Sequence, residues 1–185
     1  MDNIFFDLRK LKHLGKNVII GKTVRIRYPE LVTIGDNCII DDFTYISTAL
    51  ELKGHIHISA GCKLIGGRES TVSIGEYSTL SPGVVLVAGS DDYVGGIATP
   101  LVPIEVKGDV ELGSIYLKKH CLIGSNSVIL PNVTFGEGAA VGALSLVNCD
   151  LKAWGLYAGI PAKKIKDRNK EQIVKFESVL KGKKS

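Results

Sequence analysis

Residues 123–143 read IGSNSVILPNVTFGEGAAVGA, and an apolar side chain returns at every sixth position of this stretch. The repeat positions are Ile123, Ile129, Phe135 and Val141. Gly, Asn, Pro and acidic residues fill many of the positions between them, and these residues favour tight turns. Neither the helical period of about 3.6 residues nor the strand period of about 2 alone produces this spacing. The stretch therefore predicts very short strands joined by turns.

The same period extends outward over most of the chain. The other repeat positions are Ile34, Ile40, Ile46, Leu52, Ile58, Leu64, then after a slip of four residues Ile74, Leu80 and Leu86, and after a long interruption Leu117 and Val147. The fourth residue after a repeat position is usually small, and Cys38, Cys62 and Cys121 all occupy it, which predicts small core residues and not ligands. Three such faces make a coil of about eighteen residues. The expected fold is all-β, a parallel β-helix.

Composition excludes several classes of protein. With 185 residues, 45 % hydrophobic and 23 % charged, the chain is not disordered. No apolar run approaches the roughly 18 residues of a membrane span, and the N-terminus does not resemble a signal peptide, so we expect a cytoplasmic protein. The net charge of +4 is concentrated at residues 163–185, which hold nine Lys or Arg against three acids. This distribution argues against a nucleic-acid-binding face.

The repeat divides the chain into three parts. Residues 1–17 form an expected N-terminal cap, with a short amphipathic helix at 4–13. Residues 18–162 form the β-helix domain, interrupted by a loop at about 87–116. Residues 163–185 form an expected basic C-terminal helix, because apolar residues recur at helical spacing over 166–181. Both ends are expected to cover the open ends of the solenoid.

The chain resembles the hexapeptide-repeat acyltransferases, through residues 123–143 and through the ending YAGIPAKKIK at 157–166. The ending is similar to the family's Gly-Asn-Pro-Ala-Lys-x-Ile signature, with Ile160 in place of the Asn. The resemblance covers about residues 18–168 and is closest for the subgroup that acetylates sugars, including enzymes of surface polysaccharide assembly. It implies a left-handed β-helix, a homotrimer, and acetyl-CoA bound between neighbouring subunits. The implied acceptor is a sugar or nucleotide sugar.

The acetyl-CoA residues are implied by position. A pantetheine arm lying along the coils needs narrow walls of small residues with free backbone groups, one of which could hold the thioester oxyanion. The phosphates of CoA need cations. The small residues at the family's positions are Gly124, Ser125, Gly142, Ala143 and Ser145, and the cations are Lys163, Lys164, Lys166 and Arg168. Tight turns and a solvated tail are the plainer explanations of the same residues.

The long loop departs from the family pattern. In similar sugar acetyltransferases a His at the start of this loop acts as general base, and that position falls on Asp91. A carboxylate of ordinary pKa about 3.9 is a weak base for a hydroxyl but is sufficient to position an amine and accept its proton. Asp91, its neighbour Asp92, and His120, if the chain returns it to the loop, are the candidate catalytic residues. The departure favours N-acetylation over O-acetylation without excluding the latter.

Other functions are less well supported. His55 and His57 share a strand face, but no third ligand is evident, so no metal site is expected. A γ-type carbonic anhydrase needs three zinc-binding His, which the sequence does not offer. A non-enzymatic β-helix scaffold is the alternative, favoured by the missing loop His. The polar loop and the Pro-Ala-Lys ending favour an acetyltransferase instead. The acceptor and the length of the acyl chain stay open.

Overall fold

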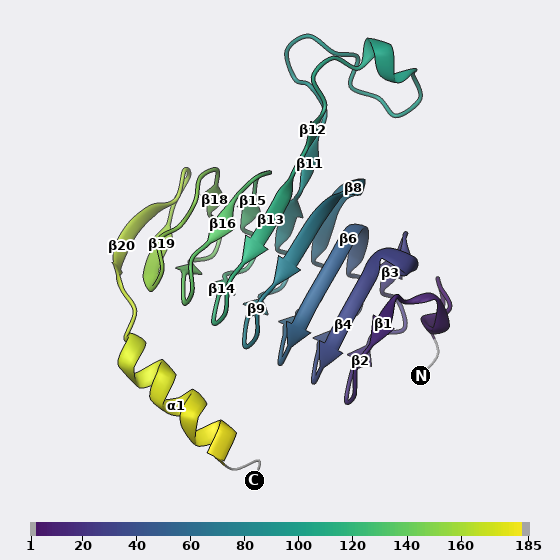
Figure 1. Cartoon of the computed structure of the whole chain (residues 1–185). Coiled ribbons are helices and arrows are strands. Elements are labelled where there is room, and N and C mark those ends of the chain that lie inside the picture. The colour runs from purple at the N-terminus through teal and green to yellow at the C-terminus, as the bar shows by residue number, and fades with distance from the viewer. Residues whose placement is uncertain (1–2, 183–185) are drawn as a thin grey trace.

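The computed structural model describes residues 3–182, which form a parallel β-solenoid with a protruding loop and a C-terminal helix (Figure 1). Each coil has three faces. The first face consists of seven parallel strands, β2 (Ile19–Ile20), β5 (Ile39–Ile40), β7 (His57–Ile58), β9 (Thr79–Leu80), β14 (Leu122–Ile123), β17 (Ala140–Val141) and β19 (Gly155–Ala158). β20 (Lys163–Asp167) adds to β19 antiparallel.

Two long strands, β6 (Tyr45–Gly54) and β8 (Lys63–Ile74), bend around a corner and contribute to both other faces. The remaining strands of the second face are β3 (Arg25–Ile26), β10 (Val85–Val87), β15 (Val128–Ile129) and β18 (Leu146–Val147). Those of the third face are β1 (His13–Leu14), β4 (Val32–Asp36), β13 (Ser114–Leu117) and β16 (Thr134–Phe135). We call the corner between the first and second faces the first corner, that between the second and third faces the second corner, and that between the third and first faces the third corner.

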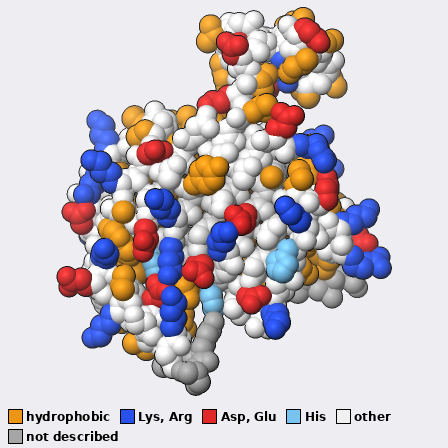
Figure 2. Space-filling view, viewed as in Figure 1, with side chains coloured by type: hydrophobic (Ala, Val, Ile, Leu, Met, Phe, Trp, Pro, Cys, Tyr) orange, Lys and Arg blue, Asp and Glu red, His pale blue; other side chains and the backbone are white. Residues whose placement is uncertain are grey.

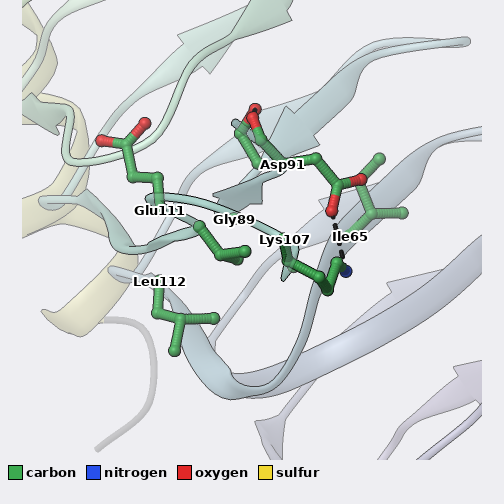
Figure 3. Close-up of a pocket in the computed structure, with 9 residues that line it drawn as sticks. Ile65, Gly89, Asp91, Lys107, Glu111 and Leu112 are labelled. Atoms are coloured by element: carbon green, nitrogen blue, oxygen red, sulfur yellow. Dashed lines mark hydrogen bonds and ion pairs between the residues drawn. The ribbon is translucent and has the colours of Figure 1, made fainter. Parts of the chain in front are cut away.

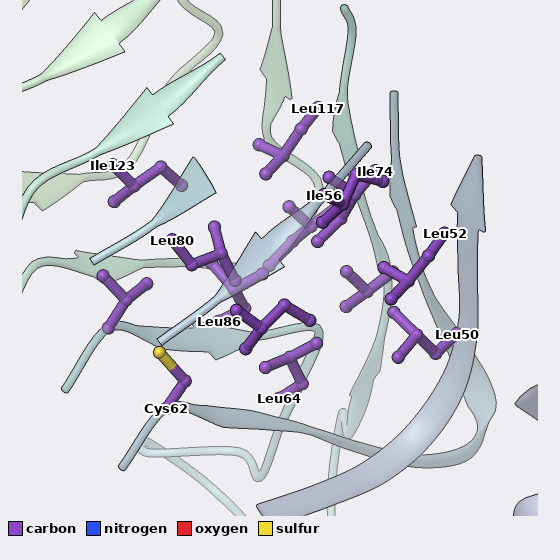
Figure 4. Close-up of a cluster of buried hydrophobic side chains, with 14 of the residues drawn as sticks. Leu50, Leu52, Ile56, Cys62, Leu64, Ile74, Leu80, Leu86, Leu117 and Ile123 are labelled. Atoms are coloured by element: carbon purple, nitrogen blue, oxygen red, sulfur yellow. The ribbon is translucent and has the colours of Figure 1, made fainter. Parts of the chain in front are cut away.

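The repeat positions fill the core, as the sequence predicts (Figure 4). All fifteen are at most 3 % exposed, and they stack in register, for example Ile40 on Ile58 and Ile58 on Leu80. Cys38, Cys62 and Cys121 are buried among them, whereas Cys149 is exposed. Burial raises the pKa of the Cys121 thiol to about 12, so it stays protonated and is not a nucleophile. The predicted coil architecture is confirmed; its left-handedness stays a prediction.

The four-residue slip forms a bulge at the second corner. β6 pairs with β8 through Thr48 and Gly67, and then through Ala49 and Thr71. The intervening residues of β8 therefore have no backbone pairing partners on β6, although the Thr48 hydroxyl donates to the carbonyl oxygen of Ser70 at 2.7 Å, and the chain bows outward there. Arg68 lies in this bulge and is exposed.

The loop also leaves from the second corner. β11 (Gly89–Ser90) and β12 (Glu111–Leu112) form a two-stranded antiparallel ribbon that lifts the loop away from the coils, and the tip contains a 3-10 turn, η3 (Ile104–Val106) (Figure 1). Within residues 3–182 no helix has the length and hydrophobicity to cross a membrane.

Both predicted terminal helices differ from the structure. Residues 4–13 form only a 3-10 turn, η1 (Leu8–Lys10), which ends at Leu11 in extended backbone, because so short a segment gains too few helical hydrogen bonds. Residues 13–14 already pair with β4, so the solenoid begins inside the predicted 1–17 cap; another 3-10 turn, η2 (Pro29–Leu31), follows in the first coil. At the other end the helix α1 spans Lys170–Gly182, and residues 163–167 form β20 instead. Residues 1–2 and 183–185 of the predicted cap and helix lie outside the described residues.

Candidate functional site

A cavity of about 310 Å³ lies where the loop leaves the second corner (Figure 3). It is lined by Ile65, Gly66, Gly89, Ser90, Asp91, Lys107, Val110, Glu111 and Leu112. Asp91 follows β11 directly, and its Oδ1 pairs with Nζ of Lys107 at 2.9 Å. The Asp91 side chain is 41 % exposed, and no other hydrogen bond to its carboxylate occurs within residues 3–182. A carboxylate oxygen is therefore open to a ligand in the cavity.

Two glycines allow the coil and the loop to meet below this cavity. A Cβ on Gly66 would lie 2.9 Å from the backbone N of Gly89. A Cβ on Gly89 would lie 2.7 Å from the carbonyl oxygen of Gly66. Both distances are shorter than a side-chain carbon tolerates, so the base of the loop requires glycine at both positions.

Asp92, the second candidate, has a different environment. Its Oδ1 accepts the N–H groups of Val94 at 2.8 Å and Gly95 at 3.1 Å, and its Oδ2 accepts the N–H of Asp109 at 3.1 Å. These backbone hydrogen bonds lower the pKa of Asp92. Both carboxylate oxygens are thus occupied in joining the two sides of the loop, and Asp92 does not line the cavity.

His120, the third candidate, is not near the loop. It lies at the third corner, whereas Asp91 lies at the second, so the expectation that chain re-entry brings the two together is wrong. The His120 Nε2 is 2.7 Å from Oε2 of Glu177 on α1, and its ring stacks on Tyr77 with a centroid distance of 5.3 Å. With 8 % exposure, the imidazole is buried between the coil and the helix.

The residues implied for acetyl-CoA gather at the first corner. Gly124 and Ser125 follow β14, and Gly142 and Ala143 follow β17 in the next coil. A Cβ on Gly124 would lie 2.4 Å from the backbone N of Ala143, so the two coils touch closely. Within residues 3–182 the N–H groups of Ser125 and Ala143 have no hydrogen-bond acceptor, while those of Gly124 and Gly142 bond to the coil above. These small residues therefore form a narrow surface along the first corner, with two backbone N–H groups free to donate hydrogen bonds to a ligand.

The lysines approach the end of this row. β20 pairs Lys163 with Ala158 of β19. Ala158 occupies the position of Gly142 one coil further toward the C-terminus. Lys163, Lys164 and Lys166 are all exposed, and Lys164 pairs with Asp167 at 2.6 Å. Arg168 turns away instead: its Nη1 donates to the carbonyl oxygens of His120 at 2.8 Å and Gly138 at 2.7 Å. Arg168 therefore links two coils at the third corner by hydrogen bonds.

His55 and His57 are paired with other side chains and do not belong to a set of metal ligands. His57 Nε2 pairs with Asp41 Oδ2 at 2.8 Å, and the His55 ring stacks on Tyr77 at 4.9 Å. No group of three His, Cys, Asp or Glu side chains that could hold a metal ion occurs in the described part of the chain.

The coils built on a six-residue repeat, the loop with its polar cavity and the row of small residues define a β-helix protein of the hexapeptide acyltransferase type. No family model matches the chain. The chain is 34 % identical over 185 residues to the dTDP-4-amino-4,6-dideoxy-D-glucose acyltransferase of Escherichia coli, a match that covers 98 % of this chain and 94 % of that protein. It is 28 % identical over 155 residues to the putative colanic acid biosynthesis acetyltransferase WcaF of Escherichia coli (strain K12), with 84 % and 69 % covered.

A solved structure extends the match to three dimensions. AntD, an N-acyltransferase from Bacillus cereus crystallised with dTDP and 3-hydroxybutyryl-CoA, has a TM-score of 0.90 and 34 % identity, with 99 % of this chain and 100 % of AntD covered. The chain therefore belongs to the hexapeptide-repeat acyltransferases that act on sugars. This membership makes it an acyltransferase and sets aside the scaffold alternative.

The AntD structures also point to a residue that the sequence analysis missed. They include variants at one serine and at one aspartate ten positions further along. Ser81 and Asp91 have the same order and separation in this chain. The Ser81 N–H donates to Ile123 O at 2.9 Å, which places Ser81 beside Gly124 at the first corner. In the sequence, Ser81 precedes Pro82 and reads as an ordinary turn residue.

Proposed function

We propose that this acyltransferase moves an acetyl or similar short acyl group from acyl-CoA to the amino group of a nucleotide-linked amino sugar. The observation that carries the proposal is Asp91, a carboxylate with an open oxygen in the loop cavity, at the position where the resemblance leads us to expect an imidazole base. A carboxylate binds and orients an amine well and is a weak base for a hydroxyl. The relatives support the same acceptor: the Escherichia coli protein is named for a dTDP-amino sugar, and AntD is an N-acyltransferase.

The reaction needs no covalent enzyme intermediate. The neutral acceptor amine attacks the thioester carbonyl carbon, and a tetrahedral intermediate carries the negative charge on the former carbonyl oxygen. The C–S bond then breaks, the amide remains on the sugar, and CoA leaves as the thiolate, which takes up a proton from solvent. Asp91 orients the amine and accepts the proton that the nitrogen loses. The free N–H groups of Ser125 and Ala143 are candidate donors to the oxyanion.

The first corner supplies the acyl-CoA subsite in this proposal. The pantetheine arm lies along Gly124, Ser125, Gly142 and Ala143, and Lys163, Lys164 and Lys166 bind the phosphates. The position of β20 supports this arrangement, because it holds the lysines on a strand beside the small residues. Ser81 lies at the same corner, one coil nearer the N-terminus.

The site is incomplete within one chain. Ser81 and the small residues lie at the first corner, whereas Asp91 lies at the second, and the whole second face separates them. A homotrimer solves this problem if the first corner of one subunit faces the second corner of its neighbour. We therefore include trimer formation in the proposal, with one site at each interface. Use of acyl-CoA supports a cytoplasmic reaction, and the relative WcaF, named for colanic acid biosynthesis, supports the proposal of a product for surface polysaccharide.

The test is acyl transfer by the purified chain. Acetyl-CoA and 3-hydroxybutyryl-CoA are each supplied with dTDP-4-amino-4,6-dideoxyglucose, and with dTDP-glucose, which offers hydroxyl groups only. We expect release of CoA with the amino sugar and a product whose mass fits an amide that survives mild base. Transfer to dTDP-glucose as fast as to the amino sugar would refute N-acylation.

Asp91→Asn tests the role of the carboxylate. We expect a loss of about 10²–10⁴-fold in kcat with acetyl-CoA affinity unchanged. Glu105→Gln is the matched control, since Glu105 is an exposed loop carboxylate outside the cavity, and should act as the wild type. A fully active Asp91→Asn enzyme would remove Asp91 from the mechanism.

A further inference from the structure

A group of cations lies on the outer surface of the N-terminal coils. We define the basic cluster as Arg25, Arg27, Lys63 and Arg68, all of them exposed. Figure 2 shows Lys and Arg side chains interspersed with Asp and Glu side chains over the neighbouring face, which carries β4, β6 and β8, with the loop projecting beyond it. The sequence gives no hint of the cluster, because residues 1–162 carry a slight negative charge in total. Folding concentrates positive charge that the sequence distributes over 44 positions.

Two of the guanidinium groups share one aromatic ring. The Cζ atoms of Arg27 and Arg68 lie 5.5 Å and 4.9 Å from the centroid of the Tyr28 ring. Cation–π contacts of this kind hold guanidinium groups in place while leaving their N–H donors free. The arrangement brings two like charges together, which is unfavourable unless an anion joins them.

Acidic side chains of this chain neutralise only part of the positive charge of the basic cluster. Glu30 pairs with Nη1 of Arg68 at 2.8 Å. Within residues 3–182, Arg25, Arg27 and Lys63 form no ion pair. Glu30 and the exposed Glu69, next to Arg68 in the bulge, supply two carboxylates against four cations, so the cluster retains a net positive charge that suits an anionic ligand.

The basic cluster is connected to the loop cavity by the strand register. Ile65, which lines the cavity, pairs with Ser47 on β6. Arg27 follows β3 directly, and its N–H donates to Ile46 O at 2.8 Å, so it lies beside Ser47 on the other side. Arg27 is therefore two strand spacings, about 10 Å, from the cavity wall on the same outer face. The residue between them is a small serine.

We propose that the basic cluster binds the diphosphate of the acceptor, while Asp91 holds its amine. This inference rests on the proposed function, and it gives the nucleotide end of the acceptor a site of its own. A nucleotide-linked amino sugar has an ammonium group at one end of the ring and a diphosphate at the other. The protein has a carboxylate and a group of arginines in the same order along the second corner. Acceptor binding removes the repulsion between Arg27 and Arg68.

The CoA phosphates are not the ligand of the basic cluster. The lysines of β20 lie at the C-terminal end of the solenoid, and β8, with Lys63 and Arg68, is separated from that end by three strands of the second face, β10, β15 and β18. The donor and the acceptor thus enter from opposite ends of the solenoid, each with its phosphates on a separate group of cations. Their reactive groups meet between these ends.

Calorimetry with dTDP as the probe tests the proposal. Arg27→Gln and Arg68→Gln should each weaken dTDP binding by about 10–100-fold, because each removes charge-assisted hydrogen bonds to phosphate. Thymidine, which lacks the diphosphate, should bind all variants equally, and so should acetyl-CoA. Arg68→Lys should recover part of the affinity. Arg9→Gln is the matched control, since Arg9 is an exposed arginine that pairs with Asp7 in the N-terminal cap.

Kinetics separate a ligand site from a structural role. In the variants KM for the dTDP-amino sugar should rise at least tenfold, while the rate with the free amino sugar stays within a factor of three of the wild type. Loss of stability with unchanged KM would show that the arginines only pack on Tyr28, and would overturn the inference.

The proposed function fails separately, if the wild type acylates neither the free nor the nucleotide-linked amine. Acylation by the wild type together with unchanged dTDP binding in both arginine variants refutes the basic cluster alone.

Discussion

Replacement of Glu177 by Gln should release the C-terminal helix from the solenoid. No residue of α1 is buried, yet the Glu177 side chain is only 11 % exposed and lies at the contact between α1 and the third corner. Its carboxylate pairs with Lys119, with His120 at 2.7 Å, and with Lys181 at 2.6 Å. Glutamine keeps the size of the side chain and removes the charge that joins these groups.

The magnitude follows from the pKa of Glu177. Burial of the carboxyl raises the pKa, but hydrogen bonds from Lys119, Lys181 and His120 outweigh it and lower the pKa from its ordinary 4.5 to about 2. A shift of this size corresponds to at most about 3 kcal/mol. Because solvent screens an ion-pair network at the edge of the molecule, we expect about 1–2 kcal/mol in practice. The depressed pKa stabilises the folded helix contact above about pH 4.5 and ceases to do so as the pH falls toward 2.

Hydrogen exchange of the α1 amides measures this contact directly. At pH 6 the Glu177→Gln variant should exchange about 5–30-fold faster than the wild type, and the difference should shrink as the pH is lowered toward 2. Trp154, the single tryptophan, gives a second signal, because Lys170 of α1 lies 5.8 Å from its ring. Glu171→Gln on the exposed side of α1 is the control. Equal exchange at pH 6, or a difference that persists unchanged at pH 2, would refute the reasoning.

Three further predictions concern the loop, the third corner and the core, and Gly61→Ala is the control for the second of them. Asp92→Ala, which removes the acceptor of three loop N–H groups, should raise KM for the acceptor several-fold and leave acetyl-CoA binding by calorimetry unchanged. Gly138→Ala places a Cβ 2.3 Å from the Trp154 ring at a φ of +70°, and should cost about 2–4 kcal/mol in urea unfolding. Gly61→Ala, with a φ of +72° and open space around it, should cost only about 1 kcal/mol. Leu86→Ala, at a core position with 0 % exposure, should cost about 2–5 kcal/mol by the same measurement.

The core of the fold was predictable because its cause is local and repeated. Every coil must bury one large side chain per face. The spacing of Ile34, Ile40 and Ile46 therefore predicts a coil even when the residues that pack against them are unknown. The terminal segments lack this repetition. The apolar residues around Phe6 and Leu11 suggested a helix by spacing, but they pack against the open end of the first coil in extended and 3-10 backbone.

The candidate site was predictable only where it follows the coil register. Gly124 and Gly142 occupy equivalent turns, so their alignment along one corner follows from the period itself. His120 shows the limit of that argument. Its partner Glu177 is 57 positions away on an element outside the repeat, and no spacing rule relates the two. Ser81 shows another limit, since a serine in a turn has the same appearance whether or not it contacts a substrate.

The division of the proposed site between the first and second corners has a physical basis in the solenoid. A coil gives each residue a fixed corner and a fixed height, and the filled core prevents a side chain at one corner from reaching another. Ser81 and Asp91, ten residues apart in sequence, therefore cannot meet within one chain. If both act on the same substrates, the chemistry requires a second copy of the chain. A mixture of inactive Asp91→Asn and Ser81→Ala subunits should then recover activity on co-assembly, because some interfaces combine the two intact corners, whereas a site built by one chain alone would stay inactive.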